Sequence, residues 1–153
     1  GAEFEARVGL NRLASALTSW AFSVNWTLVE SQAEVEDNVG IEHSKKRPLT
    51  SQSPYVVNTG LFYSSASGST QGSLLFSAFG KRLSDLGLQA LPDVYERPFK
   101  SLDVALSHKL GGYTLKASVE NILGEDQVFK QGGETTFKAA GGRSVGFSIS
   151  TGS

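Results

Sequence analysis

The sequence predicts an all-β fold, an antiparallel up-and-down segment of a transmembrane β-barrel with about seven strands. Three observations predict it: apolar and polar residues alternate along most of the chain, short and long connections alternate, and aromatic residues stand near strand ends. The clearest strand is 20–28, where Trp20, Phe22, Val24, Trp26 and Leu28 alternate with small or polar residues. This period of two is typical of a strand with two different faces.

The same alternation predicts the other strands in chain order. Apolar residues recur at every second position in 4–10, 55–63, 102–106, 115–119 and 145–149, and the stretch 74–79 carries apolar residues on both faces. The stretch Leu10 to Leu17 has a short helical pattern and also fits a turn.

The lengths of the connections indicate which kind of all-β protein this is. Turns near 13–17, 65–69 and 111–112 are short, and Gly111-Gly112 favours a two-residue hairpin. Between them lie long polar segments, 32–52, 83–100 and 124–142. Outer-membrane barrels have this arrangement, with tight periplasmic turns and long outer loops. It directs the last strand inward, so that the C-terminus is expected at the periplasmic rim.

The two faces of the strands carry the candidate site residues. Amphipathic rings favour membrane interfaces, which predicts interface positions for Trp20, Trp26, Tyr55 and Tyr63. Ordinary core or rim aromatics are the alternative. We expect the other face to line a polar lumen or to face a plug domain, through Arg7, Asn25, Asn58, Asp103, Lys109, Lys116 and Glu120. A soluble sandwich gives the same alternation, so the alternation by itself leaves both architectures open.

Composition limits the function classes. The net charge of −1 gives no support for a nucleic-acid partner, and the chain has no cysteine for disulfides or thiolate metal sites. No apolar run approaches the roughly 18 residues of a transmembrane helix, which excludes a helical membrane protein. A membrane barrel stays open because its strands alternate.

Several stretches, taken in order, resemble the end of TonB-dependent outer-membrane receptors, especially those of Bacteroidota-like bacteria. The segments that carry the resemblance are 47–63 (RPLTSQSPYVVNTGLFY), 74–83 (LLFSAFGKRL), 92–98 (PDVYERP), 102–110 (LDVALSHKL), 115–123 (LKASVENIL), 129–132 (FKQG) and 142–147 (GRSVGF). The resemblance runs from about Phe4 to the end. It implies that residues 1–153 are the C-terminal part of such a barrel, with the plug domain outside this sequence.

The resemblance also implies a function and partners. The whole receptor would be a barrel of about 22 strands around a plug, importing large, scarce nutrients such as iron chelates, cobalamin, glycans or peptides. Its partners would be the rest of the barrel, the plug, the TonB system, outer-membrane lipid and lipopolysaccharide, with a surface lipoprotein as a further candidate. The family usually ends on an aromatic residue, and this sequence ends on Ser150-Thr151-Gly152-Ser153. The alternative is a small stand-alone β-barrel or β-sandwich that acts as a structural or binding module.

Residues with catalytic or metal-binding chemistry give little support for an enzyme. His43 and His108 lie far apart in the sequence, which favours solvated side chains over a metal site. The pairs Asp93 with Glu96 and Glu30 with Glu34 fit loop or lumen charges better than a general acid and base. The basic run Lys45-Lys46-Arg47 is expected as a solvated loop, with lipopolysaccharide phosphate as the alternative contact. We therefore expect a non-enzymatic protein of the bacterial outer membrane without a cofactor.

Overall fold

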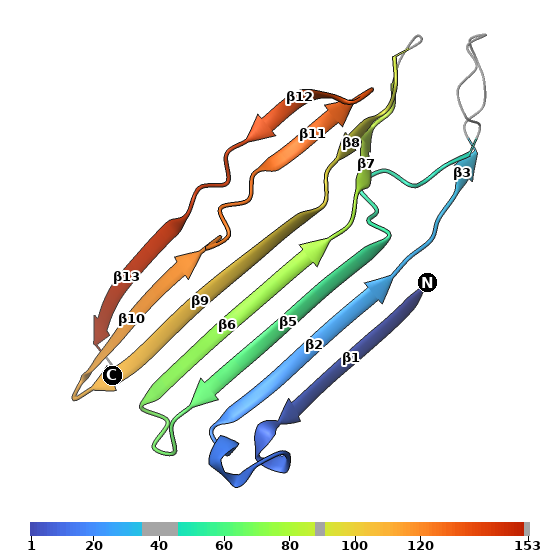
Figure 1. Ribbon diagram of the computed structural model, residues 1–153. Helices are drawn as coiled ribbons and strands as arrows, with labels where there is room; N and C mark the ends of the chain where they lie inside the picture. The colour runs from blue at the N-terminus through green and yellow to red at the C-terminus, as the bar shows by residue number, and fades with distance from the viewer. Residues whose placement is uncertain (35–45, 88–90, 152–153) are drawn as a thin grey trace.

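The computed structural model describes residues 1–34, 46–87 and 91–151, and its main feature is one seven-stranded antiparallel sheet (Figure 1). The strands lie side by side in chain order, as in an up-and-down meander. They are β1 (Ala2–Gly9), β2 (Trp20–Leu28), β5 (Tyr55–Ser64), β6 (Thr70–Phe79), β9 (Phe99–Leu110), β10 (Tyr113–Glu120) and β13 (Ser144–Thr151). The prediction of an all-β fold is confirmed. The sheet is open, with β1 and β13 as its two edges.

The alternating runs of the sequence mark these strands closely. Strand β2 has the predicted bounds, and β5 extends one residue past its predicted end. Of the strands that begin earlier than predicted, β6 at Thr70 and β9 at Phe99 are extended most. The added residue Thr70 pairs with His108 of β9, and the added residue Phe99 pairs with Phe79 of β6. The backbone ladder therefore continues where the apolar alternation is weak.

Three short connections lie together at one end of the main sheet, which we call the short-turn end (Figure 1). Two 3-10 turns, η1 (Leu10–Arg12) and η2 (Ser15–Leu17), join β1 to β2, where the sequence fits either a turn or a short helix. The turn between β5 and β6 closes with a hydrogen bond of 2.8 Å from the Gly68 N–H to the Ser65 carbonyl. Gly111 joins β9 to β10 with a φ of 60°, which glycine adopts without strain. Among the residues that the structure describes, no helix has the length and apolar character needed to cross a membrane.

The long connections at the opposite end contain regular structure that the sequence did not predict. Strands β3 (Ala33–Glu34) and β4 (Lys46–Arg47) form a two-stranded ladder, and residues 35–45 of the expected outer loop lie outside the described part of the chain. The other two connections build a four-stranded sheet, the upper sheet, in the order β12-β11-β8-β7. Its strands are β7 (Arg82–Asp85), β8 (Val94–Glu96), β11 (Gln127–Gln131) and β12 (Glu134–Ala139). These strands are too short for an alternation of apolar and polar residues to predict them.

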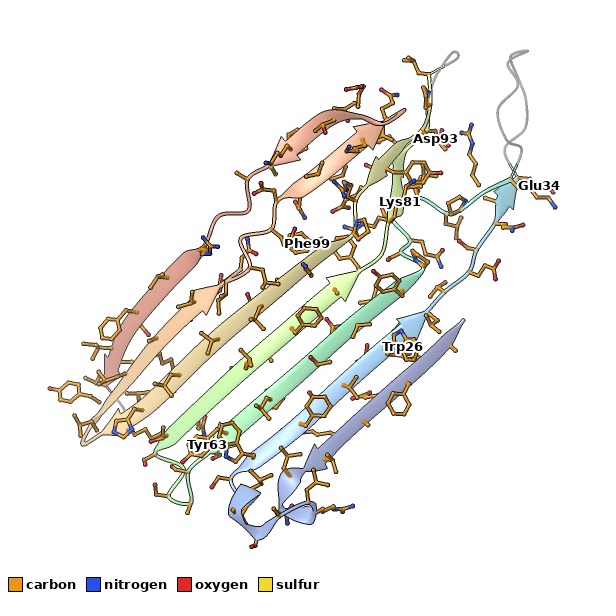
Figure 2. The ribbon with its side chains drawn as sticks, in the orientation of Figure 1. Trp26, Glu34, Tyr63, Lys81, Asp93 and Phe99 are labelled. Carbon is orange, nitrogen blue, oxygen red and sulfur yellow. The ribbon has the colours of Figure 1, made fainter. Side chains whose placement is uncertain are left out.

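The described part of the chain has almost no interior. Its accessible surface is 10540 Å², whereas a compact globular protein of 16.3 kDa exposes about 7,500 Å². In the described part of the chain, Leu83 is the one large hydrophobic side chain that is fully buried. It lies in β7 of the upper sheet, so the main sheet is a single layer whose two faces are uncovered by any other part of the described structure (Figure 2).

Candidate functional site: a two-faced sheet

One face of the main sheet is apolar from edge to edge, and we call it the apolar face. Residues directly opposite each other in an antiparallel ladder share a face. The register therefore places in one row, across all seven strands, Val8, Phe22, Leu61, Leu74, Val104, Val119 and Val145. Many of these side chains are exposed, Leu74 by 39% and Val145 by 79%. An exposed apolar row that is continuous across a whole sheet is unusual for a soluble monomer.

Aromatic rings stand at both ends of the apolar face. All four predicted interface residues lie on it: Trp20 and Tyr63 near the short-turn end, and Trp26 and Tyr55 near the opposite end. Trp20 and Tyr63 are cross-strand partners whose ring centroids lie 5.0 Å apart. Tyr55 and Tyr63 are separated along β5 by roughly 27 Å, at about 3.4 Å per residue. A lipid-facing apolar band is about 25 Å tall, so the spacing of the rings fits such a band.

The seven residues predicted to face a lumen or plug all lie on the other side of the sheet, which we call the polar face. The register sets each of them one position out of phase with the apolar face; they are Arg7, Asn25, Asn58, Asp103, Lys109, Lys116 and Glu120. Sequence reasoning therefore brought together residues from five strands on one surface, because the antiparallel register preserves the alternation of every strand.

Hydrogen bonds between neighbouring strands order several of these polar side chains. The Asn25 amide donates to Glu3 at 3.1 Å, and Ser77 donates to Oδ1 of Asn58 at 2.7 Å. The carboxylate of Asp103 does not point to a partner on the sheet face; it accepts the backbone N–H of Asn121 at 2.7 Å. Asp103 thus holds the turn that follows β10 as well as lying on the polar face.

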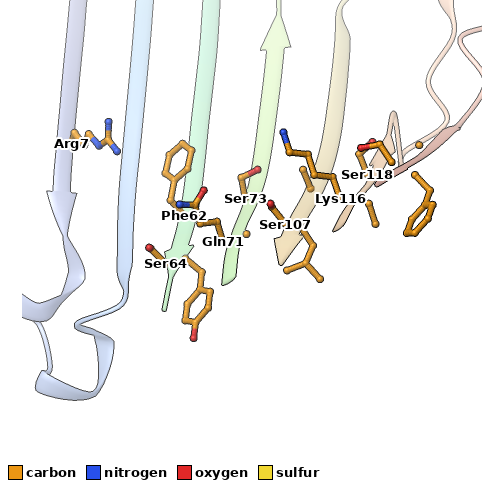
Figure 3. A pocket seen from close by; sticks show the side chains of 16 residues that line it. Arg7, Phe62, Ser64, Gln71, Ser73, Ser107, Lys116 and Ser118 are labelled. Atoms are coloured by element: carbon orange, nitrogen blue, oxygen red, sulfur yellow. The ribbon is translucent and has the colours of Figure 1, made fainter. Parts of the chain in front are cut away.

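A groove of about 690 Å³ lies near the short-turn end of the sheet (Figure 3). Small side chains such as Ser73, Ser107 and Ser118 line it, and these leave room above the sheet. Its charged residues are Arg7 and Lys116, and no carboxylate of the described chain lines it. The guanidinium of Arg7 lies 5.5 Å from the centre of the Phe62 ring. The groove is therefore a shallow, cationic and hydroxyl-rich surface.

Two ion pairs, one buried and one partly buried, hold the upper sheet and the segments beside it, and sequence reasoning missed both. Arg47 pairs with Asp93 at 3.1 Å, and Arg82 pairs with Glu96 at 2.6 Å. The expectation that Lys45-Lys46-Arg47 is a solvated run is wrong for Arg47, whose side chain is 9% exposed. The Arg47 side chain can be buried because its charge is paired with the carboxylate of Asp93, which is distant in the sequence. Asp93 and Glu96, considered above as a carboxylate pair, each have their own arginine.

Asn121 connects the main sheet with the β11–β12 hairpin. Its φ of 50° lies in the left-handed region, which asparagine tolerates better than most residues. Its side-chain amide donates to the carbonyls of Glu125 at 3.1 Å and of Gly142 at 2.8 Å, and its carbonyl oxygen accepts the Glu125 N–H at 3.2 Å. One side chain thereby holds both the outgoing and the returning arm of the hairpin.

A second contact at the base of this hairpin carries charge. Lys138 donates to Asp126 at 2.7 Å, and the backbone N–H of Gly141 donates to the same carboxyl group at 3.1 Å. The hydrogen bond from Lys138, with a further contribution from the Gly141 N–H, lowers the pKa of Asp126 below its ordinary value. The carboxylate therefore stays ionised at neutral pH and joins β12 to the turn before β11.

The described residues do not form a metal site. They contain no group of three or more histidine, cysteine, aspartate or glutamate side chains placed to hold a metal ion. His108 lies on the apolar face, where its Nδ1 is 2.9 Å from the Thr70 hydroxyl, while His43 falls outside the described part of the chain. Comparisons with protein-family models, with curated proteins and with solved structures found no match to this chain.

Proposed function

We propose that this chain is one arc of the wall of an outer-membrane β-barrel, in an importer of the TonB-dependent kind that its sequence resembles. The observation that supports this most is the uncovered apolar face of a single-layer sheet, bounded at both ends by aromatic rings. Leaving such a face in water is costly, at roughly 25 cal/mol per Å² of apolar surface. Lipid removes that cost without a second layer of protein.

The polar face supports the orientation of the arc. In a barrel of this kind the face opposite the lipid lines the lumen. Arg7, Asn58, Asp103 and Lys116 would then face the lumen or a plug, together with the hydroxyl-rich groove. The short-turn end would lie in the periplasm, and the upper sheet would rise outside the membrane as part of the surface that meets substrate.

The directions of the strands support an arc of a larger barrel. Because β1 and β13 are separated by an odd number of alternating strands, they run in the same direction. Closing this sheet on itself would pair β1 with β13 in parallel. Leaving both edges open would expose unpaired N–H and C=O groups to lipid, which costs several kcal/mol for each group. A fully antiparallel barrel therefore needs an odd number of further strands. The barrel of about 22 strands implied by the resemblance satisfies this requirement.

The test compares two neighbouring residues that lie on opposite faces. Leu74 is near the middle of β6 on the apolar face, and Ser73 lies on the polar face. In phosphatidylcholine vesicles, Leu74→Arg should reduce the membrane-inserted, protease-resistant fraction, because arginine at the bilayer midplane costs about 2–4 kcal/mol. Ser73→Arg should leave that fraction close to the unsubstituted value. Equal effects of both substitutions would contradict a lipid-facing apolar side.

The alternative, a small soluble β-sandwich module, makes a different prediction for the same chain. Its apolar face would be covered by a second copy or by another protein, so the chain would stay soluble without detergent as a discrete assembly. Analytical ultracentrifugation in buffer and in detergent separates the two cases. A stable, detergent-independent dimer would overturn the membrane proposal, and aggregation in buffer with recovery in detergent supports it.

A further inference from the structure

The upper sheet carries a cationic pocket that none of the features above explains. Its volume is about 450 Å³, and its lining includes three cationic side chains, Lys81, Arg97 and Lys130, beside Tyr95. The register explains why they meet: Tyr95 pairs with Lys130 on one side and with Leu83 on the other. Lys81 immediately precedes β7 and Arg97 immediately follows β8, where the Arg97 N–H donates to the Val128 carbonyl at 2.9 Å, and both residues line the same pocket.

No carboxylate within the described ranges forms an ion pair with any of these three cations. In the described part of the chain, the four ion pairs with carboxylates involve Arg47, Arg82, Lys100 and Lys138. The amine of Lys81 lies 4.0 Å from the centre of the Tyr95 ring, and that of Lys130 donates to the Gly133 carbonyl at 3.2 Å. Clustered cations repel each other, so their proximity favours binding of an anion.

Asp93 is the one acidic residue among the described residues that line the pocket, and it is already neutralised. Asp93 pairs with Arg47 at 3.1 Å and accepts the Gly87 N–H at 2.9 Å. The pocket wall is also held in place, because Gln131 donates to the Pro92 carbonyl at 2.8 Å and ties the β11–β12 hairpin to the segment before β8. A site with positioned walls loses less entropy when a ligand binds.

We propose that this pocket binds the phosphate of a phosphorylated sugar. A phosphate monoester carries about −1.5 to −2 charges at neutral pH, which matches several unpaired cations, and arginine can engage its oxygens through two parallel hydrogen bonds. The Tyr95 ring, with Pro92 and Pro98 beside it, offers an apolar surface for the body of a sugar. The ligand is either the phosphorylated headgroup of an outer-leaflet glycolipid or a soluble sugar phosphate.

The soluble sugar phosphate as ligand does not depend on the barrel assignment, whereas the glycolipid headgroup as ligand rests on the proposed function. The test can be made on the full chain in detergent micelles. The probe is glucose 1-phosphate, with glucose as the neutral control, and binding is followed by calorimetry. We expect saturable binding of the phosphate compound alone, weakening as salt rises. The double variant Arg97→Gln, Lys130→Gln should bind at least about tenfold more weakly, because it removes two charge-assisted contacts.

A matched variant, Arg12→Gln with Lys100→Gln, removes one arginine and one lysine outside the pocket and should bind as the unsubstituted chain does. Circular dichroism of both double variants checks that each keeps its strands. The glycolipid arm measures co-sedimentation with phosphatidylcholine vesicles with and without lipid A. Binding in either arm that the pocket variant selectively loses supports the site and identifies the source of the phosphate. No binding in both arms, or equal loss in the two double variants, overturns it.

Discussion

The backbone N–H of Asn121 donates a hydrogen bond of 2.7 Å to the carboxylate of Asp103, joining the turn after β10 to the neighbouring strand β9. The same asparagine holds both arms of the β11–β12 hairpin through its side chain. The two residues therefore form the connection between the main sheet, proposed to lie in lipid, and the upper sheet, proposed to lie outside it.

Replacing Asn121 should loosen the hairpin. Asn121→Gly keeps the left-handed backbone without strain and removes three side-chain hydrogen bonds, so local opening of the hairpin should become easier by about 1–3 kcal/mol. Asn121→Ala should destabilise the hairpin further, because the positive φ is strained for alanine. Hydrogen exchange of 127–131, compared with that of β5, measures the effect. Unchanged exchange in Asn121→Gly would show that the side chain does not hold the hairpin.

Acid should weaken the base of the same hairpin. The Asp126 pKa is lower in the folded chain than in the unfolded chain, so its ion pair and hydrogen bond stabilise the fold at neutral pH. That contribution is complete above the unfolded pKa of about 3.9 and is lost as pH falls through the folded pKa. NMR titration of the Asp126 carboxyl carbon should give a raised pKa in Lys138→Gln. Lys109→Gln, on the main sheet, should leave that pKa in place.

Removing the charge of Glu96 should destabilise the upper sheet. Its side chain is 5% exposed and pairs with Arg82, which is 30% exposed, so Glu96→Gln leaves a partly buried arginine without its partner. We expect a loss of about 1–3 kcal/mol, below the cost for a fully buried pair because solvent reaches Arg82. Glu134→Gln, on exposed strand β12, should change stability by less than about 0.5 kcal/mol. Urea unfolding in detergent gives both values; equal losses would contradict a role for the pair.

Both tryptophans should report the interface of a bilayer. The variants Trp20→Phe and Trp26→Phe each keep a single one of these two tryptophans. The fluorescence of that tryptophan should be quenched more strongly by lipids brominated near the headgroup than by lipids brominated at mid-chain. A chain with both of these substitutions and Phe62→Trp places its single tryptophan on the polar face, where quenching should be weak. Strong quenching of that third variant would place lipid on the wrong face.

The main sheet could be predicted from the sequence because the pattern that marks each of its strands is local. Every second residue of a strand shares a face, so Trp20–Leu28 predicts its own bounds, and antiparallel pairing carries the alternation from strand to strand. The same periodicity placed Trp20, Trp26, Tyr55 and Tyr63 on one face and all seven polar candidates on the other. The local pattern marked Thr70 and Phe99 poorly, since their strand pairing comes from neighbours.

Only the tertiary structure determined the upper sheet and the contacts that hold it. Its strands are three to six residues long, too short for a reliable period. The pairing of Arg47 with Asp93 and the grouping of Lys81, Arg97 and Lys130 around Tyr95 join segments that are far apart along the chain. By itself, the sequence determined the two faces of each strand, because alternation is a property of the extended backbone. The tertiary structure decided which of the described charges are paired with a carboxylate, because that depends on which distant segments meet.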